Sequence, residues 1–411
     1  MTTTTWMRTA ALVVGIAVLV TSPAAAEGFG EVGGIKFGAL TIFPSLSTGI
    51  RYDSNIYFSP DKTADQRRLN TPGKESDFIL NVSPDVQFDV TTGGFNAQLG
   101  YTFYGDIFAG YDDPAKMHQR LNAANHTFRG EVGYTAPIGF LVDVKDQFLL
   151  QEEFTNSNVY VDYLPGRQKH NDGTFTIGYN RPPDGTVYVT AAYRNLYDDF
   201  DKRSFEKYDR VDHFLDLILH LKFFPRTAVV LEATGGALRH PHDADFNALV
   251  YYGMAGVQGQ ITNHIELRLK GGFAVWDFVK FDDYRQFIAT GEVAFIWPPA
   301  TRVAVGYDRY VEPGSDTNFR ATDEIHLTYE QVFNDRFGLD SGISYMFNFY
   351  SRPKKVDEQY LNAHVDLTTR LLYWFYLGVG YDLQYKMVEP GRSTEADITR
   401  HTAMVKVQAK F

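Results

Sequence analysis

The chain has 411 residues, with 50 acidic and 39 basic side chains and a formal net charge of −11. It has no cysteine, so no disulfide can hold the fold together. The acidic balance argues against nucleic acid as a partner, because nucleic-acid-binding domains present a basic face. Aromatic residues make up 15% of the chain and glycine contributes 35 residues. This richness in Tyr, Phe and Gly predicts a mostly β protein.

The first 26 residues have the pattern of a secretory signal peptide. Arg8 supplies the positive charge, residues 10–20 form an apolar stretch, and small residues precede a cleavage site after Ala26. The apolar stretch is too short for a spanning helix, which needs about 20 apolar residues. We predict Sec-type export with removal of residues 1–26, a Gly-rich periplasmic lead-in over residues 27–38, and a single barrel domain over residues 39–411.

From the lead-in to the end, one pattern repeats. Segments of about 10 to 14 residues alternate apolar with polar side chains, and their connections are alternately short and long. Successive side chains of a strand point to opposite faces, so each segment has one apolar and one polar face. We count eighteen segments, nine long connections and eight short ones, and sixteen strands would also fit. The clearest segments are 78–90, 361–371 and 375–387, and the longest connections are 59–76 and 155–169.

Long strands, alternating loop lengths and aromatic residues at strand ends are typical of transmembrane barrels. The last residues alternate back from Phe411 through Val407 and Val405, which resembles the C-terminal signal that outer-membrane barrels present for assembly. We therefore predict an all-β fold, a transmembrane antiparallel up-and-down β-barrel of about 18 strands. Its place is the outer membrane of a Gram-negative bacterium. Its partners are the membrane lipids, lipopolysaccharide and the barrel-assembly machinery.

Charged residues on the polar faces are predicted to line a water-filled lumen, because a charge facing lipid is costly. Their signs are nearly balanced, which leaves two interpretations open: a solvated lumen of mixed charge, or a ladder that guides an anionic polymer. The predicted channel-lining residues are Arg51, Asp85, Arg129, Lys145, Arg194, Asp216, Lys222, Arg268, Lys270, Glu292, Asp308, Glu330, Asp340, His364, Asp366, Arg370, Asp382, Lys386, Arg400 and Lys406.

A motif closes the first predicted strand, with Gly49, Tyr52, Asp53, Ser54, Asn55 and Tyr57, and a Val-Ser-Pro segment follows at residues 82–84. Residues 40–90 resemble the β-barrel porin 2 family of Gram-negative outer membranes, whose members often accompany exopolysaccharide export systems. The resemblance implies a conduit or accessory role in exopolysaccharide secretion, with a periplasmic polysaccharide export protein as a candidate partner. From the residues themselves, the motif is either a rim turn with capping side chains or a calcium or glycan contact.

No pattern of catalytic residues stands out, and we predict no enzyme activity, no metal and no cofactor. The loop segment His240-Pro241-His242-Asp243 has two imidazoles, which is too few for a structural metal site. The function we predict is an outer-membrane channel for exopolysaccharide secretion. Two alternatives stay open: a general or solute-selective diffusion porin, which would fold a long connection such as 59–76 into the lumen, and a structural or adhesive surface barrel.

Overall fold

The computed structural model describes residues 33–59, 74–112, 122–152, 167–180, 185–201, 206–280, 282–297, 300–313, 318–334, 336–351, 357–388 and 397–411. The predicted signal peptide and most of connections 59–76 and 155–169 lie outside these residues. In the part of the chain that is described, no helix has the length and apolar character needed to cross a membrane.

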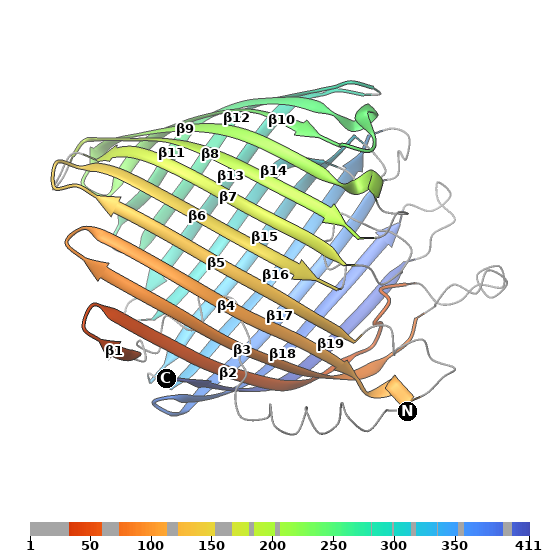
Figure 1. Ribbon diagram of the computed structural model, residues 1–411. Coiled ribbons are helices and arrows are strands. Elements are labelled where there is room, and N and C mark those ends of the chain that lie inside the picture. The colour runs from red at the N-terminus through yellow and green to blue at the C-terminus, as the bar shows by residue number, and fades with distance from the viewer. Residues whose placement is uncertain are drawn as a thin grey trace.

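Eighteen long strands form the wall of the molecule, as Figure 1 shows. They are β2 (Leu40–Asp53), β3 (Asp77–Thr92), β4 (Phe95–Phe108), β5 (Ala123–Thr135), β6 (Phe140–Gln151), β7 (Gln168–Asn180), β8 (Val187–Phe200), β9 (Arg210–Phe224), β10 (Thr227–Arg239), β11 (Ala248–Thr262), β12 (Ile265–Phe278), β13 (Tyr284–Trp297), β14 (Thr301–Pro313), β15 (Phe319–Phe333), β16 (Phe337–Tyr350), β17 (Glu358–Leu372), β18 (Phe375–Val388) and β19 (Ile398–Lys410).

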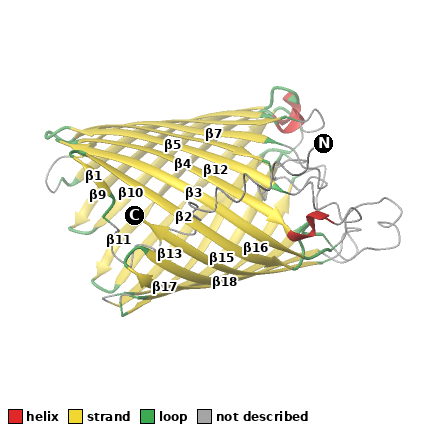
Figure 2. Ribbon diagram, turned by 60° about the horizontal axis from the view of Figure 1, so that its bottom comes forward, coloured by secondary structure: helices red, strands yellow, loops and turns green. Residues whose placement is uncertain are grey.

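Each strand pairs antiparallel with its neighbours in sequence, and β19 pairs with β2 from Thr402↔Asp53 to Lys410↔Ser45. This last pairing closes the sheet into a barrel, which both views of the molecule show (Figures 1 and 2). The predicted fold class and the strand number of eighteen are confirmed. A short extra strand, β1 (Ile35–Phe37), lies within the predicted lead-in and folds back on β2 through Gly38, whose φ is +63°.

The alternation in each strand separates an outer apolar face from an inner polar one. On β18, Val379 and Tyr381 point outward and are exposed at 49% and 44%. The alternate positions, Asp382 and Gln384, point inward. Closure pairs backbone groups between all neighbouring long strands, although the β13–β14 ladder covers only part of its length; pairing is what a sheet in hydrocarbon requires. Short connections at one end carry turn residues such as Gly93 and Gly94, which adopt φ of +53° and +88°.

Several strands extend further into the long connections than the sequence predicts. Residues 168 and 169 fall in the predicted connection 155–169 but belong to β7, where they pair with residues of β8. The side chains at these ends are paired, because Lys169 Nζ lies 2.7 Å from Asp199 and Gln168 donates to Asp198 at 2.9 Å. The polar composition of these residues predicted a loop. They are in strands because their side chains pair with those of the neighbouring strand. Among the described residues, 3₁₀ turns at this end are Ala109–Asp112, Glu206–Tyr208 and Ala244–Phe246.

Two strand pairings are shorter than the others. The β19–β2 and β13–β14 ladders each join nine residue pairs, whereas the other ladders between the long strands join ten to fourteen. We call the β19–β2 junction the closing seam and the β13–β14 junction the lapped seam.

Candidate functional site

The inner face of the barrel carries ion pairs that reach past an intervening strand. Arg51 on β2 contacts Asp106 on β4 at 2.9 Å, and Lys270 on β12 contacts Glu232 on β10 at 2.8 Å. Side chains two strands apart meet in this way on the concave side of a curved sheet. The charged residues on these faces therefore point toward the barrel axis.

Most of the charged residues that the alternation assigns to the lumen form ion pairs or hydrogen bonds, in most cases with a residue on the adjacent strand. The pairs are Arg51–Asp106, Arg129–Asp85, Lys145–Glu131, Arg194–Asp216, Arg268–Glu292, Lys270–Glu232, Arg302–Glu292, Arg302–Glu330, His364–Asp340, Lys386–Glu358 and Arg400–Asp53, and Asp308 accepts from Thr290.

The remaining predicted residues lie on the same face by register. Asp366 is opposite Asp340, Asp382 is opposite His364, Arg370 is opposite Tyr376, and Lys406 is opposite Gly378. Lys222 differs from all of them because its side chain is exposed and has no hydrogen-bond or ion-pair partner among the described residues. A free ammonium group is thus present in the lumen near the short connections.

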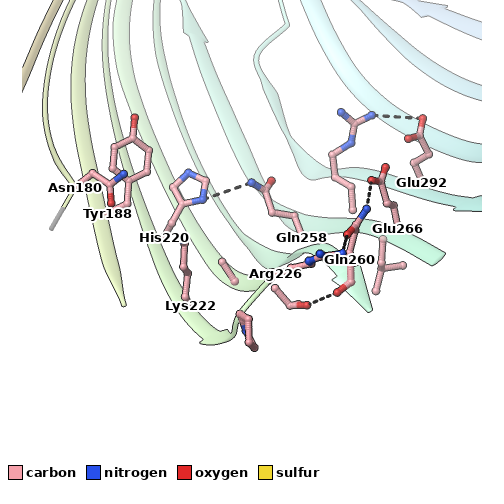
Figure 3. A pocket seen from close by; sticks show the side chains of 15 residues that line it. Asn180, Tyr188, His220, Lys222, Arg226, Gln258, Gln260, Glu266 and Glu292 are labelled. Atoms are coloured by element: carbon pink, nitrogen blue, oxygen red, sulfur yellow. Dashed lines mark hydrogen bonds and ion pairs between the residues drawn. The ribbon is translucent and has the colours of Figure 1, made fainter. Parts of the chain in front are cut away.

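Lys222 borders a cavity of about 670 Å³ at the short-connection end of β7–β13. Figure 3 shows its side chains, which include Asn180, Tyr188 and His220 beside Lys222. The lining residues are almost all on the inner faces of their strands, so the cavity belongs to the lumen.

A chain of hydrogen bonds runs along one wall of this cavity. Arg226 Nη1 donates to Gln260 Oε1 at 2.8 Å, and Gln260 Nε2 donates to Glu266 Oε1 at 3.1 Å. Arg268 lies 3.8 Å from Glu292, and its side chain keeps 49% of its surface exposed. The wall therefore presents three basic groups, those of Lys222, Arg226 and Arg268, against two carboxylates.

Sequence reasoning found only part of this cavity. Lys222, Arg268 and Glu292 were predicted from strand alternation. Gln258, Gln260 and Tyr188 are neutral and gave no charge signal, and Arg226 lies in the turn between β9 and β10, where alternation does not apply.

The family motif lies at the closing seam, where it joins the first long strand to the last. Arg400 Nε on β19 donates to Asp53 Oδ2 at 2.9 Å, and Asn55 N–H donates to Asp53 Oδ1 at 2.9 Å. Asn55 Nδ2 donates to the carbonyl of Thr399 at 3.1 Å, and His401 N–H donates to Ser54 Oγ at 2.7 Å. Asp53, Ser54 and Asn55 therefore make capping contacts across the rim, and the calcium or glycan contact stays a prediction.

Of three further motif residues, Gly49 lies at the same junction, whereas Tyr52 and Tyr57 pack on the side of β3. A Cβ at Gly49 would press on the carbonyl oxygen of Val405, so glycine allows the close approach of β2 and β19. Tyr52 packs on Phe78 on the outer face, with ring centroids 5.1 Å apart. Tyr57 is buried, and its burial, together with the nearby Glu75 carboxylate, raises the pKa of the Tyr57 hydroxyl to about 12.

The predicted assembly signal forms the outer face of β19. Val405 is 52% exposed toward the outside, and Val407 pairs with Thr48 of β2. Phe411 stacks on Trp374 with ring centroids 5.5 Å apart, and its N–H donates to the carbonyl of Pro44 at 3.1 Å. The terminal residues are therefore integrated into the closing seam. Their recognition by an assembly machinery stays a prediction.

The His240–Asp243 segment does not gather its ligand-type side chains. His242 Nε2 lies 3.3 Å from Asp209, while burial and the charge of Arg210 lower the pKa of His240 to about 4. Within the described ranges, no three His, Cys, Asp or Glu side chains are placed to hold a metal ion.

Comparison with solved structures supports the barrel fold. OccK2 (OpdF) of Pseudomonas aeruginosa aligns with a TM-score of 0.50 at 9% identity over 90% of this chain and 98% of its own. The outer membrane protein opdK of the same organism gives 0.48 at 9% identity over 90% and 99%, and OccAB3 of Acinetobacter baumannii gives 0.49 at 11% over 90% and 99%. No family model and no curated protein sequence matches the chain. The fold is that of an outer-membrane β-barrel.

Proposed function

We propose that the protein is an outer-membrane channel that passes small polar solutes, with a modest preference for anions. The observation that carries the proposal is the charged cavity inside an eighteen-stranded barrel. Barrels of about 16 to 18 strands enclose an aqueous channel, whereas eight-stranded ones are filled by side chains. This proposal takes up the diffusion-porin alternative and involves passive transport, with no enzymatic step.

The preference for anions follows from the charges at the cavity. Lys222 has no carboxylate partner in the described structure. The Arg268 side chain is half exposed, and its carboxylate partner, Glu292, lies 3.8 Å away. Basic groups in a narrow passage raise the local concentration of anions and speed their entry. Selectivity is expected to be modest, because Glu266 and Glu292 lie on the same wall.

Planar bilayer recordings under a salt gradient test this function. The intact chain should give stable conductance, with a reversal potential that favours anions. The double variant Lys222→Gln/Arg268→Gln should shift the reversal potential toward cations. Lys410→Gln is the control, since this inner-face lysine lies outside the cavity and its loss should shift the potential less. The absence of conductance, or an unchanged reversal potential in the double variant, would refute the proposal.

The exopolysaccharide conduit is the competing proposal, and it rests on the family resemblance alone. The motif that carries that resemblance is engaged at the closing seam through Asp53, Ser54 and Asn55. A deletion strain separates the two functions. Loss of secreted polysaccharide with normal small-solute uptake would favour the conduit, and the reverse would favour the porin.

The remaining expectations accompany this proposal. Membrane lipids, lipopolysaccharide and the barrel-assembly machinery are the proposed partners, and cleavage after Ala26 is the proposed route to the mature chain. Mass measurement of protein extracted from outer membranes tests the cleavage site.

A further inference from the structure

The ladder between β13 and β14 stops halfway along the barrel wall. It runs from Trp297↔Thr301 to Ala289↔Arg309 and goes no further. Beyond that point, residues 284–288 of β13 stay paired with β12, and residues 310–313 of β14 stay paired with β15. Two strand edges thus face each other without backbone pairing over five residues of β13, or about 16 Å at a rise of about 3.3 Å per residue.

Where backbone pairing is absent, the edge of β13 overlaps the edge of β14. Gln286 belongs to the inner side of β13, because the neighbouring Phe287 is 55% exposed on the outer side. Yet Gln286 Oε1 accepts from Arg309 Nη2 at 2.8 Å, and Arg309 shares the outer side of β14 with exposed Tyr307. The Tyr284 ring likewise meets the ring of Phe319 on β15, edge to face at 5.1 Å. The inner side of β13 therefore covers the outer side of β14 and β15.

A single apolar cluster passes through this lapped seam. It begins on the inner faces of β10–β12 with Leu238, Val250 and Trp276, and continues through Tyr284 and Ile288 of β13. On the far side it reaches Ala321, with Val311 and Phe319 packed against it. An unbroken apolar path thus connects the lumen wall with the lipid-facing surface.

Two hydrogen-bond donors lie buried in this path. The indole N–H of Trp276 and the O–H proton of Tyr284, in side chains exposed at only 6% and 1%, have no hydrogen-bond acceptor within the described structure. The Arg309 guanidinium lies beside the Tyr284 hydroxyl, to which it can only donate, and it is itself paired with the Asp323 carboxylate at 3.0 Å. A buried donor without a partner costs about 1–3 kcal/mol. Two such donors, beside a guanidinium whose charge Asp323 balances, are suited to a head group that accepts hydrogen bonds, such as a carboxylate.

We infer that the lapped seam is a lateral portal through which a single-chain amphiphile with a carboxylate head, a fatty acid, moves between the lumen and the outer leaflet. This goes beyond the proposed channel for water-soluble solutes. The apolar cluster receives the alkyl chain, and Trp276 and Tyr284 donate to the carboxylate. Opening separates side chains but breaks no ladder hydrogen bonds, because none join residues 284–288 to residues 310–313. All other ladders of the barrel would lose backbone bonds on parting.

A cross-link across the seam tests the portal. The chain has no cysteine, so Tyr284→Cys/Phe319→Cys supplies two unique thiols at the rings that touch, and a short bismaleimide bridges them. In proteoliposomes, bridging should slow dodecanoate transfer at least about tenfold relative to the same variant unbridged, and leave ionic conductance unchanged. The control Ala363→Cys/Leu383→Cys bridges paired residues of β17 and β18 and should change neither quantity.

A binding measurement covers the case in which the cysteine variant folds poorly. With Trp297→Phe and Trp374→Phe in the leaderless chain, Trp276 is the sole tryptophan. Brominated dodecanoate should then quench its fluorescence saturably, and adding Tyr284→Phe should weaken the apparent affinity severalfold. Dodecanoate transfer that is unaffected by bridging, a loss of ionic conductance on bridging the seam, or an absence of saturable quenching would each overturn the inference.

Discussion

The closing seam and the lapped seam each join nine residue pairs, yet side chains complete them in opposite ways. At the closing seam, Asp53, Asn55 and Arg400 bind across the two strands with charged and amide groups. At the lapped seam, Tyr284 and Phe319 pack as rings where backbone bonds end. The first arrangement has strict geometry and holds the strand ends together, whereas the second lets the unpaired ends of β13 and β14 part without breaking the nine paired residues. Two junctions of one barrel can thus differ in how firmly side chains hold their strand ends together.

The largest effect on the free energy of unfolding is expected from removing the Asp53 carboxylate at the closing seam. Asp53 is fully buried, and Asp53→Ala would leave the Arg400 guanidinium without its carboxylate and remove the turn that Asn55 forms on it. Removing one partner of a buried ion pair costs about 3–5 kcal/mol. Urea unfolding in lipid vesicles should therefore show a free energy of unfolding lower by about 3 kcal/mol.

The control for this prediction is an exposed ion pair at the rim. Asp277 lies 2.7 Å from Arg285, and both side chains are largely in solvent. Asp277→Ala should change the free energy of unfolding by no more than about 1 kcal/mol, as exposed pairs do. If Asp53→Ala were as mild as Asp277→Ala, the closing seam would not depend on this contact.

A smaller effect is expected from crowding the same seam. Gly49→Ala would place a methyl group against the carbonyl oxygen of Val405 and the backbone of Lys406. Inserting a methyl group where the packing is tight costs about 1–3 kcal/mol. The matched control is Gly253→Ala on β11, where a Cβ would make only an ordinary contact with the carbonyl of Glu232. Equal unfolding midpoints for the two variants would contradict the close approach of β2 and β19.

Strand alternation was enough to predict the barrel, its eighteen strands and the inward charges. Each of these follows from a period of two that the sequence displays directly, as in residues 375–387. The lapped seam could not be predicted, because Tyr284 and Ile288 alternate as regularly as residues of a paired strand. Where a ladder stops depends on the positions of both strands, and these are not encoded in either strand alone.

The cavity was predictable only where its residues carry charge. Lys222 and Arg268 stood out on polar faces, but the position of Arg226 depends on how the β9–β10 turn folds over the lumen. The roles of Asp53 and Asn55 were also ambiguous, since capping side chains and cation ligands are the same residue types. Their partners on β19 lie more than 340 positions away in the sequence, so only the closed barrel shows these capping contacts.

Amide hydrogen exchange of the barrel in lipid nanodiscs compares the two seams most directly. If side-chain packing alone closes the lapped seam, amides at 284–288 and 310–313 that point across it should exchange much faster than amides paired between β2 and β19. Added dodecanoate should change exchange at the lapped seam and leave the closing seam as it was. Equal protection at the two seams would contradict the account.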